Sequence, residues 1–329
     1  MSTEPPSGLL HAFLLDGAGG SKRLDWAGVD AWSADQGPLW VSLDYTAADA
    51  SRWLEHNSRI DPVIRDALLD PDPRPRAVAH GNHLMLIVRG INQNEGSAPE
   101  DMISIRAWIE PSRVITMRHR MSRTLRSLAA DVEAGKGPRD TGGLVAQLVE
   151  RVVDHVSARV DTLDDQIAAC EEGAIDRTTA DLRSQLADHR RRAIALRRFL
   201  APQREALAKL AQISVGWVSD GHRRSFAEAA DRMTRTVEEL DAARDRAAVT
   251  HEELTSRAGE LTNQRLYVLS LITAIFLPLG FVCSLLGVNI GGVPLQSASW
   301  AFWALIGVFV VGVGLQVWLF RRRGWLDRE

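Results

Sequence analysis

Two long apolar segments without charge, near the end of the chain, dominate its hydrophobic pattern. Residues 266–286 and 300–320 contain no Asp, Glu, Lys, Arg or His. Each segment would extend roughly 31 Å as a helix, which is enough to cross the hydrocarbon core of a bilayer. Residues 287–299 between them are also uncharged and can form only a short connection. The pattern predicts a membrane hairpin of two helices.

The residues that flank the hairpin predict its orientation. Arg257 and Arg265 precede the first segment, a run of three arginines at 321–323 follows the second, and the connection has no Lys or Arg. Because basic residues favour the cytoplasmic side, both termini are expected in the cytoplasm. Residues 1–10 lack the charged and apolar regions of a signal peptide. Four tryptophans mark the ends of the second segment, as an interfacial belt would: Trp300, Trp303, Trp318 and Trp325.

The first part of the chain alternates between short strand-like and helix-like patterns. Branched and aromatic residues predict strands over 9–15, 38–45, 83–91, 102–110 and 113–119. Hairpin turns are expected at residues 80–83 and 110–113. Residues 47–56 and 61–69 favour helices, and Asp61 can cap the second helix with Pro62 at its first position. These features predict an α/β domain over residues 1–121.

Beyond Ser122 the pattern becomes that of long helices. Apolar residues recur at three- and four-residue steps from Val145 to Ile167, in a helix that begins near Gly142 and reaches a turn at Glu172-Gly173. A second helix follows, which Pro202 should kink or interrupt. A third begins near Asp220 and continues without a stop into residues 266–286. Its apolar stripe over 226–261 would need partners, which predicts an oligomer.

These patterns predict three regions and restrict the function. A long-helix region and stalk over 122–262 joins the domain at 1–121 to the hairpin and basic tail at 263–329. The net charge of −3 does not favour nucleic acid. The two cysteines, Cys170 and Cys283, form no CxxC motif, which suits a reducing compartment. No phosphate-binding glycine loop, Walker lysine or nucleophile elbow occurs, so an enzyme is not expected.

The first membrane segment carries a seam of small and polar residues along one helix face. Such a stripe is equally typical of close helix packing and of a pore wall. Asn263 and Asn289 at its two ends, together with Pro278 within the segment, favour the pore. The predicted pore-lining residues, called the seam below, are Asn263, Leu266, Ser270, Thr273, Leu277, Gly280 and Ser284.

The segment from Tyr267 to Pro294 contains Gly287-Val288-Asn289 and is followed by one more span and a basic tail. It resembles the CorA metal-ion transporter family. That family has a Gly-x-Asn signature at the end of the first of two spans. The resemblance covers the whole chain. It implies a homopentamer in a bacterial inner membrane, with a cytoplasmic funnel and a pore lined by the first span. Residues 274–279 and 291–294 look most like the ZntB zinc-transporter branch; the Met-Pro-Glu of magnesium transporters is replaced by Val293-Pro294-Leu295.

A physical role for Asn289 follows from its chemistry. Divalent cations give up inner waters reluctantly, so a ring of amide oxygens can accept hydrogen bonds from the ion's hydration waters without trapping the ion. Gly287 allows close approach at this mouth. Zinc-type ligands are sparse: Cys283 lies in the first span, and His80 and His83 flank a turn. No cofactor is expected apart from the transported metal ion.

Three functions remain open on the sequence. The first is transport of zinc or a related divalent cation through a homopentameric pore, which could be proton-coupled. The second is a magnesium or cobalt channel of the same family. The third is a scaffold or sensor that the hairpin anchors in membrane lipid.

Overall fold

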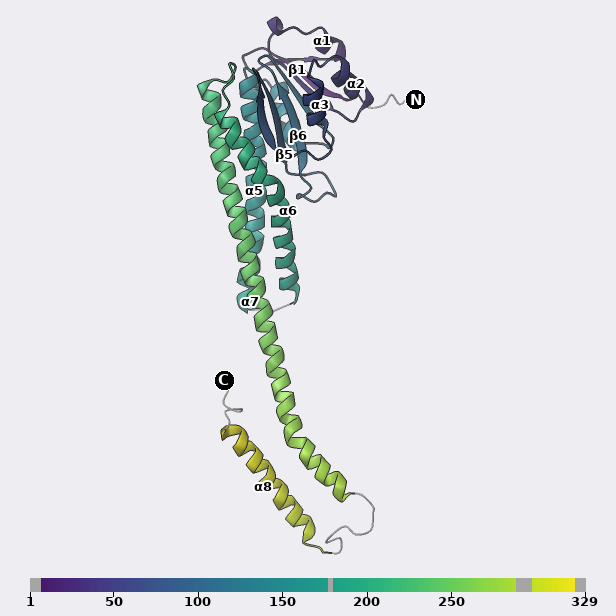
Figure 1. The fold of residues 1–329 in the computed structure, drawn as a ribbon, viewed down its shortest axis with the longest axis vertical. Coiled ribbons are helices and arrows are strands. Elements are labelled where there is room, and N and C mark those ends of the chain that lie inside the picture. The colour runs from purple at the N-terminus through teal and green to yellow at the C-terminus, as the bar shows by residue number, and fades with distance from the viewer. Residues whose placement is uncertain (1–6, 177–179, 288–297, 323–329) are drawn as a thin grey trace. The chain divides into compact units, whose positions relative to one another are not determined.

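The structure is a computed structural model that describes residues 7–176, 180–287 and 298–322. It divides into two compact units, Met1–Glu252 and Glu253–Glu329. Figure 1 shows the elements of both.

A seven-stranded mixed sheet forms the first layer of the first unit. Its order is β2-β1-β3-β7-β6-β5-β4, and all neighbours are antiparallel except β3 and β7. The five predicted strands are confirmed, and β2 and β4 are additional. The His80–His83 hairpin is confirmed as well, with Gly81 at φ +61°, where a side chain would be strained. The strands are β1 (Leu9–Leu15), β2 (Ser21–Leu24), β3 (Leu39–Asp44), β4 (Arg76–His80), β5 (His83–Gly90), β6 (Ile103–Ile109) and β7 (Arg113–Arg118).

Short helices cover one face of this sheet, whereas α4 contacts the first long helix instead. Trp53 of α2 and Leu68 of α3 pack against strand residues such as Val41 and Met85 in one buried cluster. The side chain of Asp61 accepts from the backbone N–H of Val63 at 2.8 Å, which confirms the predicted cap. Helix α4 was not predicted. The short helices are α1 (Trp26–Asp30), η1 (Ala34–Gln36), α2 (Ala48–His56), α3 (Pro62–Leu69) and α4 (Arg123–Glu133).

Two long helices, α5 and α6, lie against β4 and β5 on the other side of the sheet, and the first part of a third, α7, runs beside them (Figure 1). They are α5 (Thr141–Asp176), α6 (Ala180–Gln212) and α7 (Asp220–Leu286). The predicted turn at Glu172-Gly173 is wrong, because α5 continues to Asp176. The predicted interruption at Pro202 is also wrong. Burial of Leu200, Leu207 and Leu210 on either side stabilises α6 by more than the lost hydrogen bond costs, about 3 kcal/mol.

The apolar stripe of α7 lies mostly inside the first unit. Its residues from Phe226 to Leu254 are buried within the single chain, whereas Leu261 is exposed. Ser157 of α5 is 2.7 Å from Thr236 of α7, hydroxyl to hydroxyl, and Arg232 pairs with Asp154. The expectation that this whole stripe needs another copy of the chain is therefore wrong: α5 and α6 cover it.

The second unit contains the end of α7 and helix α8 (Ala301–Arg322). Both helices are long and apolar enough to cross a membrane. Helix α7 continues without a break through residues 266–286, as predicted, and α8 covers the second predicted segment.

Candidate pore-lining face and metal-binding residues

The seam occupies an exposed face of α7. All seven predicted pore-lining residues are exposed in the single chain, from Asn263 to Ser284. Thr273 uses its hydroxyl locally and donates to the carbonyl of Leu269 at 2.8 Å. In a hydrocarbon environment this satisfies the hydroxyl only as a donor, and its two lone pairs stay available to water or a neighbour.

The half-buried face of α7 in the second unit lies away from the seam. The more protected residues of α7 in the second unit are Tyr267, Leu271, Ile275, Leu279 and Val282. At 3.6 residues per turn, the centre of this set lies roughly 150° around the helix from the centre of the seam. The chain's own second span therefore does not cover the seam.

A groove between the two helices reaches the edge of the seam. It has a volume of about 540 Å³, and its lining includes Gly280 and Cys283 of α7 with Phe309 and Val313 of α8. Gly280 thus belongs both to the seam and to the contact region with α8. An added Cβ at Gly280 would meet nothing within 4 Å.

Gly287 closes the helix at the end of the seam. Its N–H donates to the carbonyl of Cys283 at 2.9 Å, and a Cβ at this position would lie 3.2 Å from the same oxygen. A larger residue would crowd the last turn, so glycine suits this helix end. Val288 and Asn289, the other two residues of the predicted signature, lie outside the described residues.

Sequence reasoning missed one polar residue in the second span. The amide of Gln316 donates to the carbonyl of Ala274 at 3.4 Å and connects α8 to α7. The sequence could have indicated this residue, because Gln316 is the one side-chain amide in the otherwise apolar residues 300–320. Polar side chains in such segments commonly bond across helices.

The described residues offer no ready-made zinc site. No group of three or more His, Cys, Asp or Glu side chains among them could hold a metal ion. His80 and His83 pair across the β4–β5 hairpin and contact the ring of Trp108. Burial raises the pKa of the Cys170 thiol, with Glu171 adding to the shift, so Cys170 remains protonated and is a poor metal ligand. Cys283 is exposed beside the groove.

The comparisons identify the family. The profile described as "CorA-like Mg2+ transporter protein" matches residues 35–322. The zinc transport protein ZntB of Yersinia enterocolitica is 32% identical over 320 residues, which cover 97% of both chains. The divalent cation transporter CmaX of Pseudomonas aeruginosa is 36% identical over 326 residues, again with 97% of both chains covered.

Solved structures agree over the full length. The structure of full-length CmaX matches with a TM-score of 0.86 at 34% identity and covers 98% of this chain and 99% of that one. The CorA magnesium transporter from Methanocaldococcus jannaschii matches with a TM-score of 0.79 at 17% identity, which shows the shared fold. This chain therefore belongs to the CorA-like Mg2+ transporter family, and it is a membrane transporter of divalent cations with two C-terminal spans rather than an enzyme.

Proposed function

We propose that the chain transports zinc across a bacterial inner membrane, through a central pore that α7 lines in a homopentamer. The observation that carries this proposal is the position of the seam. Polar and small residues lie exposed on the face of α7 that α8 leaves uncovered. Water or other copies of the chain would match the hydroxyls of Ser270 and Thr273 better than lipid does, because these hydroxyls can still accept hydrogen bonds. A ring of α7 helices provides both.

Several copies are required by the membrane helix rather than by the apolar stripe of the first unit. The seam of one α7 helix forms only one side of a pore, and a closed pore needs several copies of α7 around an axis. Five copies are proposed because the chain shares its family and fold with pentameric transporters. Both termini are placed in the cytoplasm, because the arginines lie at the outer flanks of the hairpin and the connection has none.

Zinc is proposed over magnesium on two grounds. ZntB, a relative of matching length, is named as a zinc transport protein, while CmaX is named for divalent cations in general. The connection has Val293-Pro294-Leu295 and lacks an acidic residue. Since the described part of the hairpin has no ligand set typical of Zn²⁺, the ion would pass hydrated, and Asn289 would contact its hydration waters. Magnesium or cobalt transport by the same pore is the alternative.

A flux assay tests the transported ion and the role of Asn289. Purified protein in proteoliposomes should take up Zn²⁺ in preference to Mg²⁺, and Asn289→Ala should reduce the flux at least tenfold while the oligomer remains intact. Normal Zn²⁺ flux through Asn289→Ala pentamers would end the proposed selectivity role. A stable monomer or dimer in mild detergent would end the proposed assembly. A protein without any metal flux would indicate a membrane-anchored scaffold.

Cysteine labelling tests which face lines the pore. In a chain without Cys170 and Cys283, a water-soluble thiol reagent should label Ser270→Cys and Thr273→Cys. The matched controls Leu271→Cys and Ile275→Cys change half-buried residues off the seam and should be protected. Labelling of the controls with protection of the seam would reverse the proposed helix orientation.

We also propose that any proton coupling uses groups outside the spans. Residues 266–286 and 300–320 contain no Asp, Glu or His to relay protons. A pH gradient should therefore change Zn²⁺ flux, yet no size-preserving substitution within the spans should remove this effect. A substitution such as Cys283→Ser that keeps Zn²⁺ flux but abolishes its pH dependence would refute this.

A further inference from the structure

A strongly basic cavity beside α6 is a feature of the first unit that the proposed transport does not use. Its volume is about 450 Å³, within the range of small-molecule sites. Arg89, Arg106, Arg120 and Arg198 contribute to the lining, together with the rings of Tyr45 and Phe199. Four guanidinium groups around one cavity favour an anionic ligand.

Arg106 is a buried arginine whose charge is only partly compensated, by Asp70 from beyond ion-pair distance and by Tyr45. It is 2% exposed, and its Nη1 donates to the carbonyl of Leu68 at 2.8 Å. Within the described part of the chain it forms no ion pair, whereas the buried Arg113 is paired with Glu110 at 2.7 Å. A buried charge that is only partly compensated is expensive, so the fold carries a cost at Arg106 that a bound anion would offset.

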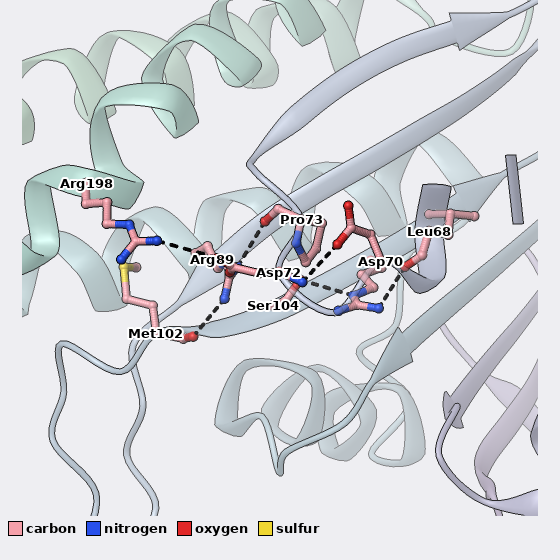
Figure 2. A network of polar contacts seen from close by, with 9 residues as sticks. Leu68, Asp70, Asp72, Pro73, Arg89, Met102, Ser104 and Arg198 are labelled. Carbon is pink, nitrogen blue, oxygen red and sulfur yellow. Dashed lines mark hydrogen bonds and ion pairs between the residues drawn. The ribbon is translucent and has the colours of Figure 1, made fainter. Parts of the chain in front are cut away.

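Arg89 lies close enough to add to this positive charge. Burial lowers the pKa of Arg106, and the charge of Arg89 lowers it further, while Tyr45 and Asp70 act in the opposite direction. Figure 2 shows the Arg89 guanidinium bound to Asp72 and to the carbonyls of Pro73 and Met102, with distances of 2.6, 2.9 and 3.2 Å. Its Nε is buried without a hydrogen-bond partner in the described structure. One donor on a fixed, charged side chain thus remains unused.

The acidic residues near the cavity are largely occupied. Glu100 in the lining contacts Arg159 at 3.3 Å and Arg192 at 3.8 Å, both outside the lining. Asp72 is shared between Arg89 and Arg198, the latter at 3.5 Å. Asp101 is exposed. These carboxylates therefore leave Arg106 and the exposed Arg120 without ion-pair partners among the described residues.

Aromatic rings hold two of the guanidinium groups in place. The Arg89 guanidinium lies 4.5 Å from the centroid of Phe199, and that of Arg106 lies 4.5 Å from the centroid of Tyr45. Stacking of this kind fixes the donors before a ligand arrives, which reduces the entropy lost on binding. The cavity thus combines fixed positive charge, unused donors and apolar walls.

We propose that this cavity binds a phosphate-bearing small molecule. Phosphate carries more charge than a single carboxylate and accepts hydrogen bonds from several guanidinium groups at once, which matches the four arginines. The shared chemistry is the phosphoryl group, either as free phosphate or as part of a larger molecule. The volume and the two rings favour a larger molecule, such as a nucleoside monophosphate. The site is separate from the seam and from the proposed ion path.

Calorimetric titration of the full-length protein in detergent tests this proposal. The probes are inorganic phosphate, adenosine monophosphate and adenosine, at one ionic strength set with sodium chloride. Adenosine monophosphate should bind, and adenosine should not. Phosphate that binds equally well would identify the free ion as the ligand, and weaker binding would identify the larger molecule. Failure of both phosphate compounds to bind, or equal binding of adenosine, would overturn the proposal.

Substitutions locate the binding in the cavity. Arg120→Gln and Arg198→Gln should each weaken binding of the phosphate compound about tenfold, because each removes one charged hydrogen bond. Both side chains are exposed, so the fold should persist, which a melting curve of each variant checks. Arg190→Gln changes an exposed arginine on the same helix, outside the cavity lining, and should leave binding unchanged. Unchanged binding in both cavity variants, or an equal loss in Arg190→Gln, would overturn the assignment.

Discussion

The ring of His11 should make the first unit sensitive to mild acid. It lies on β1 between two aromatic rings, with centroids 5.2 Å from Phe13 and 4.8 Å from Trp40. Its Nε2 is buried without a hydrogen-bond partner among the described residues. Burial, with repulsion from Arg23 and Arg118, lowers the pKa of His11 from 6.5 to about 4. The folded protein therefore holds this imidazole neutral where the unfolded chain would protonate it.

The sign and size of the effect follow from proton linkage. Between pH 6.5 and about 4 the unfolded chain binds a proton that the folded chain does not, so stability falls as the pH falls. The full difference in pKa corresponds to about 3 kcal/mol, reached below the folded pKa. From about pH 7 to about pH 5 the expected loss from this one residue is about 2 kcal/mol.

Chemical denaturation of the full chain at these two pH values measures the loss. His11→Phe keeps a ring between Phe13 and Trp40 but cannot be protonated, so its stability should fall by about 2 kcal/mol less than that of the wild type. Comparing the two chains cancels the contribution of carboxylates and other histidines. His56→Gln removes an exposed imidazole from the same unit and should keep the wild-type loss, because His11 is intact. Equal losses in His11→Phe and the wild type would refute the reasoning.

Two further predictions concern one contact within the first unit and one contact within the second unit. Arg113→Ala should destabilise the first unit by about 3 kcal/mol, because it leaves the half-buried Glu110 without its arginine partner. Arg23→Ala removes an exposed ion pair and should cost under about 1 kcal/mol. Denaturation curves that show similar losses of stability for both variants would contradict this. Gln316→Leu should weaken the contact between the two spans by only about 0.6 kcal/mol, since it removes one long hydrogen bond to Ala274. A thermal melt of the detergent-solubilised protein checks this, and loss of folded protein would contradict it.

The fold was predictable wherever one face of an element is strongly apolar. Apolar residues fill strand β5 and recur along one face of α5, and these side chains are buried in the structure. Strands β2 and β4 were missed because they are short and lie at the sheet edges, where Lys22 and Arg23 are tolerated. Helix α4 has no proline or glycine signal at its start. Its N-cap, Ser122, served in the sequence analysis only as the boundary of the long-helix region and was not identified as a cap.

Ion pairing between distant helices was the least predictable feature. The acidic residues of α5 would be expected to pair with the arginines of α6, the next helix in sequence. Instead Arg246 of α7 contacts both Asp164 and Glu171. The α6 residue Arg197 pairs with Asp241 of α7 at 2.5 Å. Periodicity reveals which face of each helix is buried, but it does not reveal how the faces are rotated against one another, and that rotation selects the partners.

The two candidate sites also differ in how far the sequence could predict them. The seam could be read from the sequence because a single helix carries it, and the register of one helix fixes which residues share a face. The basic cavity could not, because β5, β6 and α6 each contribute an arginine from far apart in the sequence. Each of these residues, taken alone, resembles an ordinary surface charge. Only the sheet order, which places β5 beside β6, brings Arg89 near Arg106.

The distribution of charge limits how this transporter can be regulated. The spans contain no acidic or basic side chain, so a response to pH or to a bound anion has to begin outside them, and the basic cavity lies in the first unit. Helix α7 belongs to both units, since it runs from Asp220 to Leu286 across the division at residue 252. Its contacts with Asp164 and Glu171, through Arg246, lie just before that division. A ligand can alter transport only if it binds two states of the protein with different affinity. For the first unit to control the pore, those states must therefore differ in how α5 and α6 hold α7.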